Sequence, residues 1–378
     1  MSEVAARQAW LGIICKISHL LTPLRADPPI IGTAEEREAR VKHIIICKRS
    51  LISFCLAEAA SLISAQKYDL AVPAATQALQ LTKDLDGELS VAVVEPMLQL
   101  SQAHLGLNLL RQAEEYLALA RWNVLNAAAE ASPCSDCVLA RLHMLQGRVL
   151  TAQGNFNAAK DELAQSIYFS SKFFGAESCT TSIGYYRLGD VFLAQGDKVS
   201  TLAFFDKVVD IWYKLLITSL TAATAEDAAP AAPPSSSSYS TLLDPNSSVT
   251  KEVPSAEVLV EGRFHLSQIL AVRQASIGDT HIATGEVLYT IGLFEFLYLK
   301  NATSALSFIA SAREVYKSSL GDSHDSTLQV ENVIRLIQER ADMEAERSIH
   351  YETQFIEEKI APEQAMMDEN LAVSVECL

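Results

Sequence analysis

The residues near the start of the chain that are best suited to chemistry are Cys15 and His19, in the segment QAWLGIICKISHLLTPLR (8–25). A cysteine and a histidine four positions apart lie on one face of a helix, and this spacing can supply two ligands to zinc. The same segment carries apolar residues at helical spacing, which favour a packed helix instead. Which of the two holds depends on the elements that follow in the chain.

Other reactive side chains are scattered. Cys134 and Cys137 form a single CxxC motif in SPCSDCVLA, and one such pair without a second favours plain loop thiols over zinc or redox chemistry. Histidines occur in two near-copies, SIGDTHIAT (276–284) and SLGDSHDST (319–327), but no nucleophile accompanies them at a fixed spacing. The sequence has no glycine-rich phosphate loop, no GxSxG and no HExxH motif. We therefore predict that the protein is not an enzyme and has no catalytic residue, cofactor or metal.

The composition narrows the class of protein. The 378 residues are half apolar and one-fifth charged, so the chain can bury a large core. The formal net charge of −16 argues against nucleic-acid binding, which needs a surplus of Lys and Arg, and leaves room for basic partners. Seven scattered cysteines are typical of reduced intracellular thiols. We recognise no signal peptide, and the longest apolar region, from His43, is interrupted by Lys48 and Arg49. These features predict a soluble, intracellular protein that binds neither nucleic acid nor membrane.

The two near-copies lie 43 residues apart, a period typical of helical solenoids. The tetratricopeptide pattern has a small residue at position 8 of helix A, glycine at 15 in the turn, and small residues at 20 and 27 of helix B. The stretch 146–166 fits with Gly147, Leu150, Gly154, Phe156, Ala159, Leu163 and Ser166, and the next unit continues with Gly189, Phe192 and Gly196. Small residues let the two helices cross closely, and glycine allows the positive φ angle that ends helix A.

Three more units follow the same pattern. They are marked by Ala59, Leu62, Tyr68, Ala71 and Ala78; by Ser101, Ala113, Leu117 and Ala120; and by Leu293, Phe296, Ala305, Ile309 and Ala312. The position-20 residues Ala71, Ala113, Ala159 and Thr201 lie 42, 46 and 42 positions apart, as in the longer repeats of kinesin light chains. We therefore predict an all-α fold, a tetratricopeptide-repeat right-handed helical solenoid. Gly278 and Gly321 should end helices B, and the Asp, Thr or Ser after them should cap the next helix.

The repeat pattern breaks between 218 and 257, where Ala, Pro and Ser dominate. This composition predicts a disordered, exposed loop, either as a tolerated insertion or in place of half a repeat. In the second case 258–276 is a helix B without its helix A, and either the long helix ending near Leu220 fills the gap or the solenoid bends there. We divide the chain into an N-terminal cap helix (1–32), a repeat array (33–220), the loop (221–256), C-terminal repeats with a capping helix (257–340) and an acidic helical or disordered tail (341–378).

The concave face of such a solenoid, formed by helices A, is the usual binding face. In the third and fourth units we predict that it binds a protein partner through Arg141, Met144, Arg148, Tyr186 and Asp190. Chaperone-binding repeats hold a carboxylate with Lys and Asn, and the corresponding places here hold Leu56 and Ala60. A receptor for chaperone tails is therefore disfavoured.

Several phrases taken together resemble the zinc finger MYND domain-containing protein 12 family, whose members carry tetratricopeptide repeats. The resemblance runs from Trp10 to Trp212 and more faintly through the C-terminal repeats. The phrases are HLLTPLR (19–25), EEREARVKHIIICKRSLISFC (35–55), KYDLAVPAATQAL (67–79), RQAEEYLALARWNVL (111–125), SIYFSSKFFGAE (166–177) and FDKVVDIW (205–212).

The MYND finger itself is degenerate or absent. In the family a His-x-x-x-Cys pair follows the tryptophan, and counted from Trp10 these ligands fall at Ile14 and Ser18. Cys15 and His19 stand in the wrong order and register, and only nine residues precede Trp10. We therefore interpret the segment as the vestige of a MYND tail, a cap helix that packs on the first repeat through Ile13, Ile14, Ile17 and Leu21.

The resemblance implies a role in motile cilia and flagella. Members of the family associate with inner-arm dyneins, beside tetratricopeptide repeat protein 29, and a green-algal relative is similar to a subunit of single-headed dynein d, which also carries actin and a light chain. The implied function is a non-enzymatic docking subunit of the axoneme, with an inner-arm dynein heavy chain, a tetratricopeptide repeat protein 29-like partner, and actin, the light chain or doublet tubulin as partners. The alternative is a cytoplasmic adaptor that binds peptide cargo in the manner of kinesin light chains. A lysine methyltransferase is excluded, since the chain has no SET segment.

Replacing Cys15 by Ser and His19 by Gln together should leave the zinc content and partner binding of the full chain unchanged, because we assign both residues to a packing helix. Elemental analysis of the purified protein measures the zinc. A stoichiometric zinc ion that is lost on this double substitution would overturn the assignment.

Overall fold

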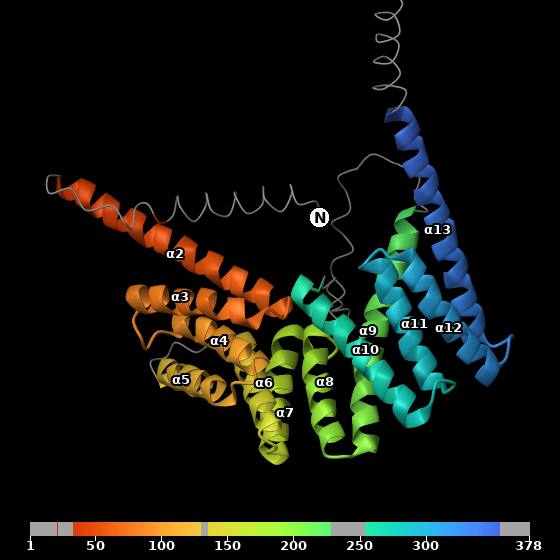
Figure 1. Ribbon diagram of the computed structural model, residues 1–378, viewed down its shortest axis with the longest axis horizontal. Coiled ribbons are helices and arrows are strands. Elements are labelled where there is room, and N and C mark those ends of the chain that lie inside the picture. The colour runs from red at the N-terminus through yellow and green to blue at the C-terminus, as the bar shows by residue number, and fades with distance from the viewer. Residues whose placement is uncertain (1–20, 22–32, 130–134, 228–253, 356–378) are drawn as a thin grey trace, which may run out of the picture. The chain divides into compact units, whose positions relative to one another are not determined.

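The computed structural model describes residue 21 and residues 33–129, 135–227 and 254–355. Within these ranges the regular structure is helical (Figure 1). The helices are α2 (Ala34–Ser64), α3 (Tyr68–Asp86), η1 (Val91–Val93), α4 (Val94–Gly106), α5 (Leu110–Ala129), α6 (Asp136–Ala152), α7 (Phe156–Phe174), α8 (Cys179–Ala194), α9 (Lys198–Asp227), α10 (Ala256–Ile277), α11 (Ile282–Leu297), α12 (Ala302–Leu320) and α13 (Asp325–Phe355).

The chain divides into two compact units. The first contains 1–211 and 241–265, and the second contains 212–240 and 266–378, so that α9 and α10 each contribute residues to both. In the first unit each α-helix from α2 to α7 packs against the next α-helix along the chain, and α4 and α6 also contact the α-helices two places away. Helices α2, α4, α6 and α8 are thus the A helices of successive pairs and form one layer, with α3, α5 and α7 as the B helices (Figure 1). In the second unit α11 packs on α12, and α12 on α13. These helix pairs confirm the predicted all-α tetratricopeptide-repeat fold.

The close crossing within each pair depends on small residues. A Cβ atom on Gly147 in α6 would lie 2.6 Å from the Cγ atom of Leu163 in α7, nearer than real side-chain contacts allow. A Cβ atom on Gly189 in α8 would lie 2.7 Å from the Cε1 atom of Phe205 in α9. The alanines predicted for position 20 are fully buried in their helices B. The predicted small positions are therefore the places where the two helices of a pair touch.

The turns between helices A and B have a left-handed residue at the predicted place. Gly154 and Gly196 have φ angles of 79° and 81°. In three other pairs the corresponding residue is Gln66, Asn108 or Lys300, with φ between 51° and 60°. A side chain with a Cβ atom makes the left-handed conformation energetically unfavourable, yet these three residues adopt it. The packing of the helix pair therefore imposes the turn geometry, and glycine is not required.

The register predicted for the last pair is wrong by one residue. The Asn301 N–H donates to the Glu295 carbonyl, six positions earlier, whereas the other turns between helices A and B close five positions earlier. This turn is therefore one residue longer. As a result Gly292, and not Leu293, occupies the small position of helix A, where it lies against the side chain of Ile309.

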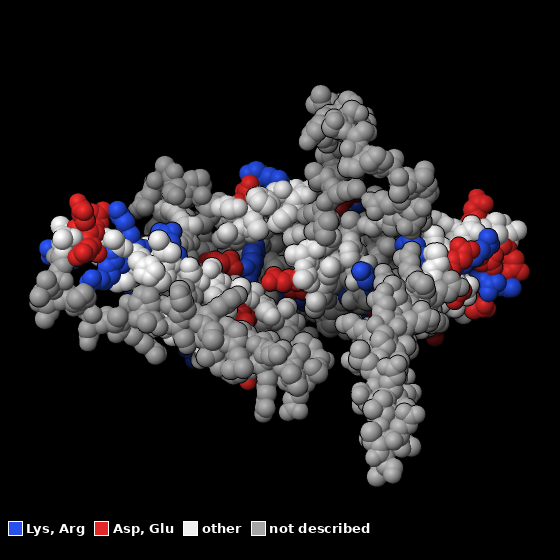
Figure 2. All heavy atoms as spheres, turned by 90° about the horizontal axis from the view of Figure 1, so that it is seen from above, with Lys and Arg blue, Asp and Glu red and all other residues white. Residues whose placement is uncertain are grey.

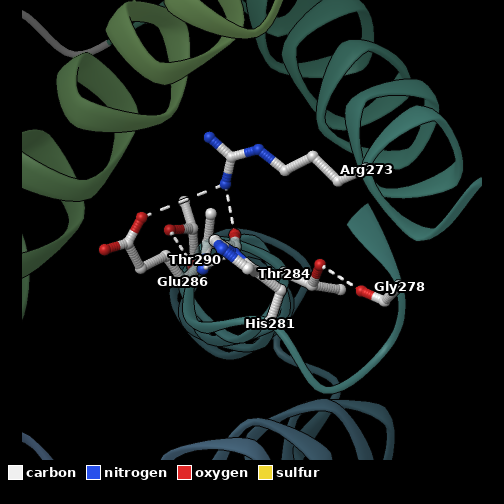
Figure 3. Close-up of polar contacts among 7 residues, drawn as sticks. Arg273, Gly278, His281, Thr284, Glu286 and Thr290 are labelled. Carbon is white, nitrogen blue, oxygen red and sulfur yellow. Dashed lines mark hydrogen bonds and ion pairs between the residues drawn. The ribbon is translucent and has the colours of Figure 1, made fainter. Parts of the chain in front are cut away.

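The glycines predicted to end helices B do so, but the predicted capping residues are wrong. Gly278 and Gly321 have φ angles of 91° and 92° and follow α10 and α12. The caps of α11 and α13 are the histidines of the two near-copies, because the Nδ1 atoms of His281 and His324 each accept a hydrogen bond of 3.2 Å from the backbone N–H two residues later. The Thr284 hydroxyl also donates to the Gly278 carbonyl, at 2.9 Å (Figure 3). The histidines of this motif thus have a structural role.

A buried arginine ties the end of α10 to the start of α11. The Arg273 side chain is 1% exposed, and its guanidinium points toward the first turn of α11 (Figure 3). It donates to the Ala283 carbonyl, and its Nη1 atom lies 4.0 Å from a carboxylate oxygen of Glu286. A hydrogen bond from a charged guanidinium is stronger than one between neutral groups, so these contacts stabilise the start of α11. We therefore assign a structural role to Arg273.

The region around the predicted loop differs from expectation at one boundary. Residues 221–227, assigned to the loop, form the end of α9, in agreement with the high helix propensity of Ala and Glu in TAATAED. The predicted helix 258–276 lies within α10. In the second unit, the buried Trp212 ring on α9 lies 5.4 Å from the Phe294 ring on α11. The long helix therefore contributes to the core of this unit. Residues 254 and 255 of the predicted loop precede α10, which already begins at Ala256. The loop residues 228–253, the N-terminal cap helix except Leu21, and the tail from 356 lie outside the described residues.

Gly147→Ala should destabilise the protein by about 1–3 kcal/mol, because the added methyl group meets Leu163 across the helix pair. In a Leu163→Ala background the same substitution should be neutral or stabilising, since the space is open and alanine favours the helix by up to about 1 kcal/mol. Denaturant unfolding of the four proteins measures the difference. Equal effects of Gly147→Ala in both backgrounds would contradict the proposed crossing.

Candidate functional site

The A-helix layer of the first unit borders a cavity of about 450 Å³, which we call the A-helix groove. Its volume is within the range of small-ligand sites, roughly 300–1,000 Å³. Its walls come from α4, α6, α7 and α8 and from residues 254–261, at the start of α10. The lining residues are Gln102, Cys137, Ala140, Arg141, Met144, Ser166, Ser170, Phe174, Thr180, Ile183, Gly184, Pro254, Ser255, Glu257, Val258 and Glu261.

Two of the predicted binding residues line the groove directly. Arg141 on α6 forms an ion pair with Glu95 and donates to the Gln102 side-chain oxygen at 3.2 Å, both on α4. Met144, one turn further along α6, adds a flexible apolar surface to the same wall. The charge of Arg141 is thus matched within the wall, and Met144 is free to adapt to an occupant.

A second pair of arginines lies beside the groove. Arg148 on α6 and Arg187 on α8 are both half-buried and close enough to repel each other. Burial and the charge of Arg187 lower the pKa of Arg148 to about 10, and the carboxylates of Glu261 and Asp190 act in the opposite direction. The Nε atom of Arg187 is buried without a hydrogen-bond partner among the described residues. The two guanidinium groups therefore make this part of the A-helix layer favourable for carboxylates.

An aromatic stack covers the same region. The ring centroids of Tyr186 on α8 and His265 on α10 are 3.8 Å apart, and Tyr186 also stacks on Phe205. Tyr186 is 5% exposed and His265 is 1% exposed. Burial raises the pKa of Tyr186 to about 12. Burial, Arg187 and Arg148 hold the pKa of His265 well below its usual range, so its ring is neutral. Neither ring nitrogen of His265 has a hydrogen-bond partner in the described part of the chain.

The predicted site residues thus gather in one region, but not as an open face. Arg141 and Met144 line the groove, and Arg148 lies close enough to Asp190 and Glu261 for both carboxylates to stabilise its charge. Tyr186 was expected to be presented to a partner, and it is instead covered by α10. Whether these five residues bind a partner stays a prediction.

Sequence reasoning missed the contribution of α10 to this site. Helical periodicity identified α10 as a helix B, and helix B residues are not expected on the binding face. The only local signal is the pair Glu257 and Glu261, four positions apart in the otherwise apolar stretch AEVLVEG. Carboxylates on one face of an apolar helix indicate a charged surface opposite, and Arg148 provides a positive charge near Glu261.

Cys137, predicted to lie in a loop, is the second residue of α6 and lines the groove. Burial raises the pKa of its thiol, which lowers the fraction of the reactive thiolate. Cys134 lies outside the described residues. Across the part of the chain that the structure describes, no group of three or more His, Cys, Asp or Glu residues is placed to hold a metal ion. In the same residues, no helix is both long and apolar enough to cross a membrane.

The helix pairs and the groove define a helical repeat protein of the tetratricopeptide type, a class that typically serves as a non-catalytic interaction scaffold. No protein-family model matches the chain. The chain is similar to the TPR-like repeats of a kinesin light chain from Podosopora anserina, with 11% identity and a TM-score of 0.35, over 71% of this chain and 96% of that one. It is also similar to BtubC (BKLC) from P. vanneervenii, with 11% identity and a TM-score of 0.30, over 72% of this chain and 93% of that one. With scores this low, the fold is defined by the helix pairs of the chain itself.

His265→Phe should remove part of the pH dependence of stability. The pKa of His265 is lower in the folded protein than the ordinary value of 6.5, so the unfolded chain binds the additional proton as the pH falls below about 6.5. The wild type should therefore lose stability between pH 7 and pH 5, with a slope from this residue of up to about 1.4 kcal/mol per pH unit.

Urea unfolding of the wild type and the variant at pH 5, 6 and 7 measures this difference. A weaker dependence should remain in the variant, since burial also lowers the pKa of His104. At pH 7 the phenyl ring should keep the stack with Tyr186 without two unpaired nitrogens, so the variant should be at least as stable as the wild type. Identical pH profiles of the two proteins would contradict the burial of a neutral His265.

Proposed function

We propose that this protein is a non-enzymatic docking subunit of the ciliary axoneme, which helps to anchor an inner-arm dynein, single-headed dynein d, on the doublet microtubule. The observation that carries the scaffold role is the A-helix groove, a lined cavity with charged and apolar walls on a helical repeat fold. The axonemal assignment rests on the resemblance to the zinc finger MYND domain-containing protein 12 family between Trp10 and Trp212.

Exposed apolar side chains support a role in an assembly. Leu119, Trp122 and Leu125 on α5 are exposed and lie three positions apart, and Tyr168 on α7 is also exposed. Apolar groups of this size on a surface often mark contacts with other proteins. All four lie in phrases that carry the family resemblance, RQAEEYLALARWNVL and SIYFSSKFFGAE. The proposal therefore uses two kinds of surface, the groove and these apolar residues.

The charge distribution fits protein partners. Among the described residues on the face in Figure 2, acidic and basic side chains lie next to each other and no continuous basic area is visible. Attachment to nucleic acid would need such an area. The proposed partners are an inner-arm dynein heavy chain, a protein like tetratricopeptide repeat protein 29, and actin, a dynein light chain or doublet tubulin.

In isolated cilia, the protein should remain with axonemes after the membrane is removed by detergent, and it should leave with the dyneins in high salt. Immunoblotting of the three fractions measures this. A tagged Trp122→Ser chain should be retained less than a Val199→Ser chain, because both residues are exposed but only Trp122 lies in the phrases that carry the resemblance. Recovery of the wild-type protein wholly in the detergent-soluble fraction would reject the docking role.

The cavity also favours a second candidate function, a cytoplasmic adaptor that binds peptide cargo in the manner of kinesin light chains. A groove of about 450 Å³ can hold several side chains of a bound segment. The fractionation separates the two candidates, since an adaptor washes out with the detergent and a docking subunit does not.

A further inference from the structure

Helix α2 extends beyond the helix with which it pairs. Ion pairs join Lys48 on α2 to Asp84 on α3, at 4.0 Å, and Arg49 to Asp86, at 3.6 Å. Asp86 is the last residue of α3, so α3 ends opposite the middle of α2. Residues 34–46 therefore continue past the end of the pair, as the ribbon in Figure 1 shows. We call residues 34–46 the α2 overhang.

The α2 overhang carries large apolar side chains on its surface. Val41 and Ile45 lie one turn apart on the same side of the helix and are 56% and 36% exposed. Ile46, next to Ile45, is 61% exposed. Further along the helix, Cys47 and Leu51 are buried. Exposed apolar side chains that lie together indicate a surface that contacts another apolar element.

The repeat array shows which kind of element such a surface contacts. Helix α4 packs against both α3 and α5, and α6 packs against both α5 and α7, so each of these A helices lies between two B helices. Helix α2 is the first A helix of the described residues and packs against α3 and α4. The place of a helix B before it falls to residues that precede 33, outside the described ranges. In solenoids each repeat buries its apolar face against its neighbours, and the first repeat needs a capping element.

Residues 8–25 have the length and the position to supply this element. The connection from them to α2, residues 26–33, is one residue longer than residues 87–93, the connection from α3 to α4. A helix of residues 8–25 is as long as residues 34–51 of α2, so an antiparallel helix that starts from this connection reaches along the whole overhang. The described residue of the segment, Leu21, is helical and half-buried.

The sequence of the segment also has the polarity of a cap. On a helix, Ile13, Ile17 and Leu21 lie on one face. Cys15 and His19 lie on the opposite face. Capping elements of solenoids have one side that packs on the array and a polar side that meets solvent. The isoleucine face therefore matches the apolar surface of the α2 overhang, and the two residues suited to zinc point away from it.

We propose that residues 8–25 fold back as a helix antiparallel to the α2 overhang and cover Val41 and Ile45, in the place of a preceding helix B. Ile13, Ile17 and Leu21 supply the apolar contacts. The cap helix assigned from the sequence thereby gains a defined surface, which lies beyond the first helix pair. The open side of the first A helix is closed by the chain itself and not by a partner. This proposal goes beyond the docking and adaptor roles and does not depend on either.

Hydrogen–deuterium exchange of the full chain, followed by mass spectrometry, tests the contact from both sides. In the wild type the amides of residues 8–25 should exchange slowly. Val41→Glu/Ile45→Glu should accelerate their exchange by about tenfold or more, because two carboxylates then face the apolar side of the segment. Glutamate favours helix, so α2 itself should remain formed. Conversely, Ile13→Glu/Ile17→Glu should accelerate exchange in the α2 overhang.

The matched control is Leu70→Glu/Val199→Glu, since these two residues are 55% and 82% exposed on other helices of the first unit. It should leave the exchange of both segments unchanged. Circular dichroism checks the fold of every variant. If Val41→Glu/Ile45→Glu does not fold, the milder Val41→Ser/Ile45→Ser variant decides in the same way.

Fast exchange of residues 8–25 in the wild type would overturn the proposal, as would unchanged exchange in the Val41→Glu/Ile45→Glu variant. Light scattering after size exclusion tests for another occupant of the α2 overhang. A wild-type mass of two chains that falls to one chain in this variant would assign the surface to a second copy and would also overturn the proposal. These outcomes are separate from the axoneme fractionation, which measures contacts with other proteins.

Discussion

The close crossing of helices A and B within each pair is the constraint on which the rest of the structure depends. At Gly147 and Gly189 the side chains of the partner helix, Leu163 and Phe205, leave no room for a Cβ atom, so they pack directly on the glycine backbone. The crossing fixes where each pair turns, even where Gln66, Asn108 or Lys300 must adopt a left-handed conformation. It also places the A helices in one layer, in which α4 contacts α6 and α6 contacts α8. The groove exists because that layer is continuous.

The charged side chains in and beside the groove come mainly from the A-helix layer. Arg141 finds its carboxylate on the neighbouring A helix, in Glu95. Arg148 and Arg187 lie side by side in the layer, and the compensating carboxylate of Glu261 comes from a helix more than 70 positions later in the chain. Interaction between charges in a half-buried site is stronger than on the surface.

Much of the fold could be predicted from the sequence, because the repeat positions are set by local contacts. Ala71, Ala113 and Ala159 could be identified by spacing alone, since each packs within its own pair. The register error at Leu293 arose because the turn length depends on a backbone hydrogen bond that has no residue signature. The capping role of His281 was missed because Ser, Thr, Asp and Asn are the usual caps.

The candidate site was less predictable because it combines distant segments. Helical spacing correctly placed Arg141 and Met144 on the A-helix layer, as both belong to one regular helix. The covering of Tyr186 by His265 depends on where α10 packs after a break of 28 residues between helices, and no periodicity extends across that break. The cues that remain are chemical, such as two glutamates in an apolar stretch, and they indicate a charged surface without locating it.

A cryo-EM map of intact axonemes tests the central claim most directly, because it shows the position of the protein. The account predicts density for the helix pairs α2 to α8 on the doublet microtubule at the base of an inner-arm dynein. A map in which the helix pairs have no counterpart beside any inner-arm dynein would contradict the docking role.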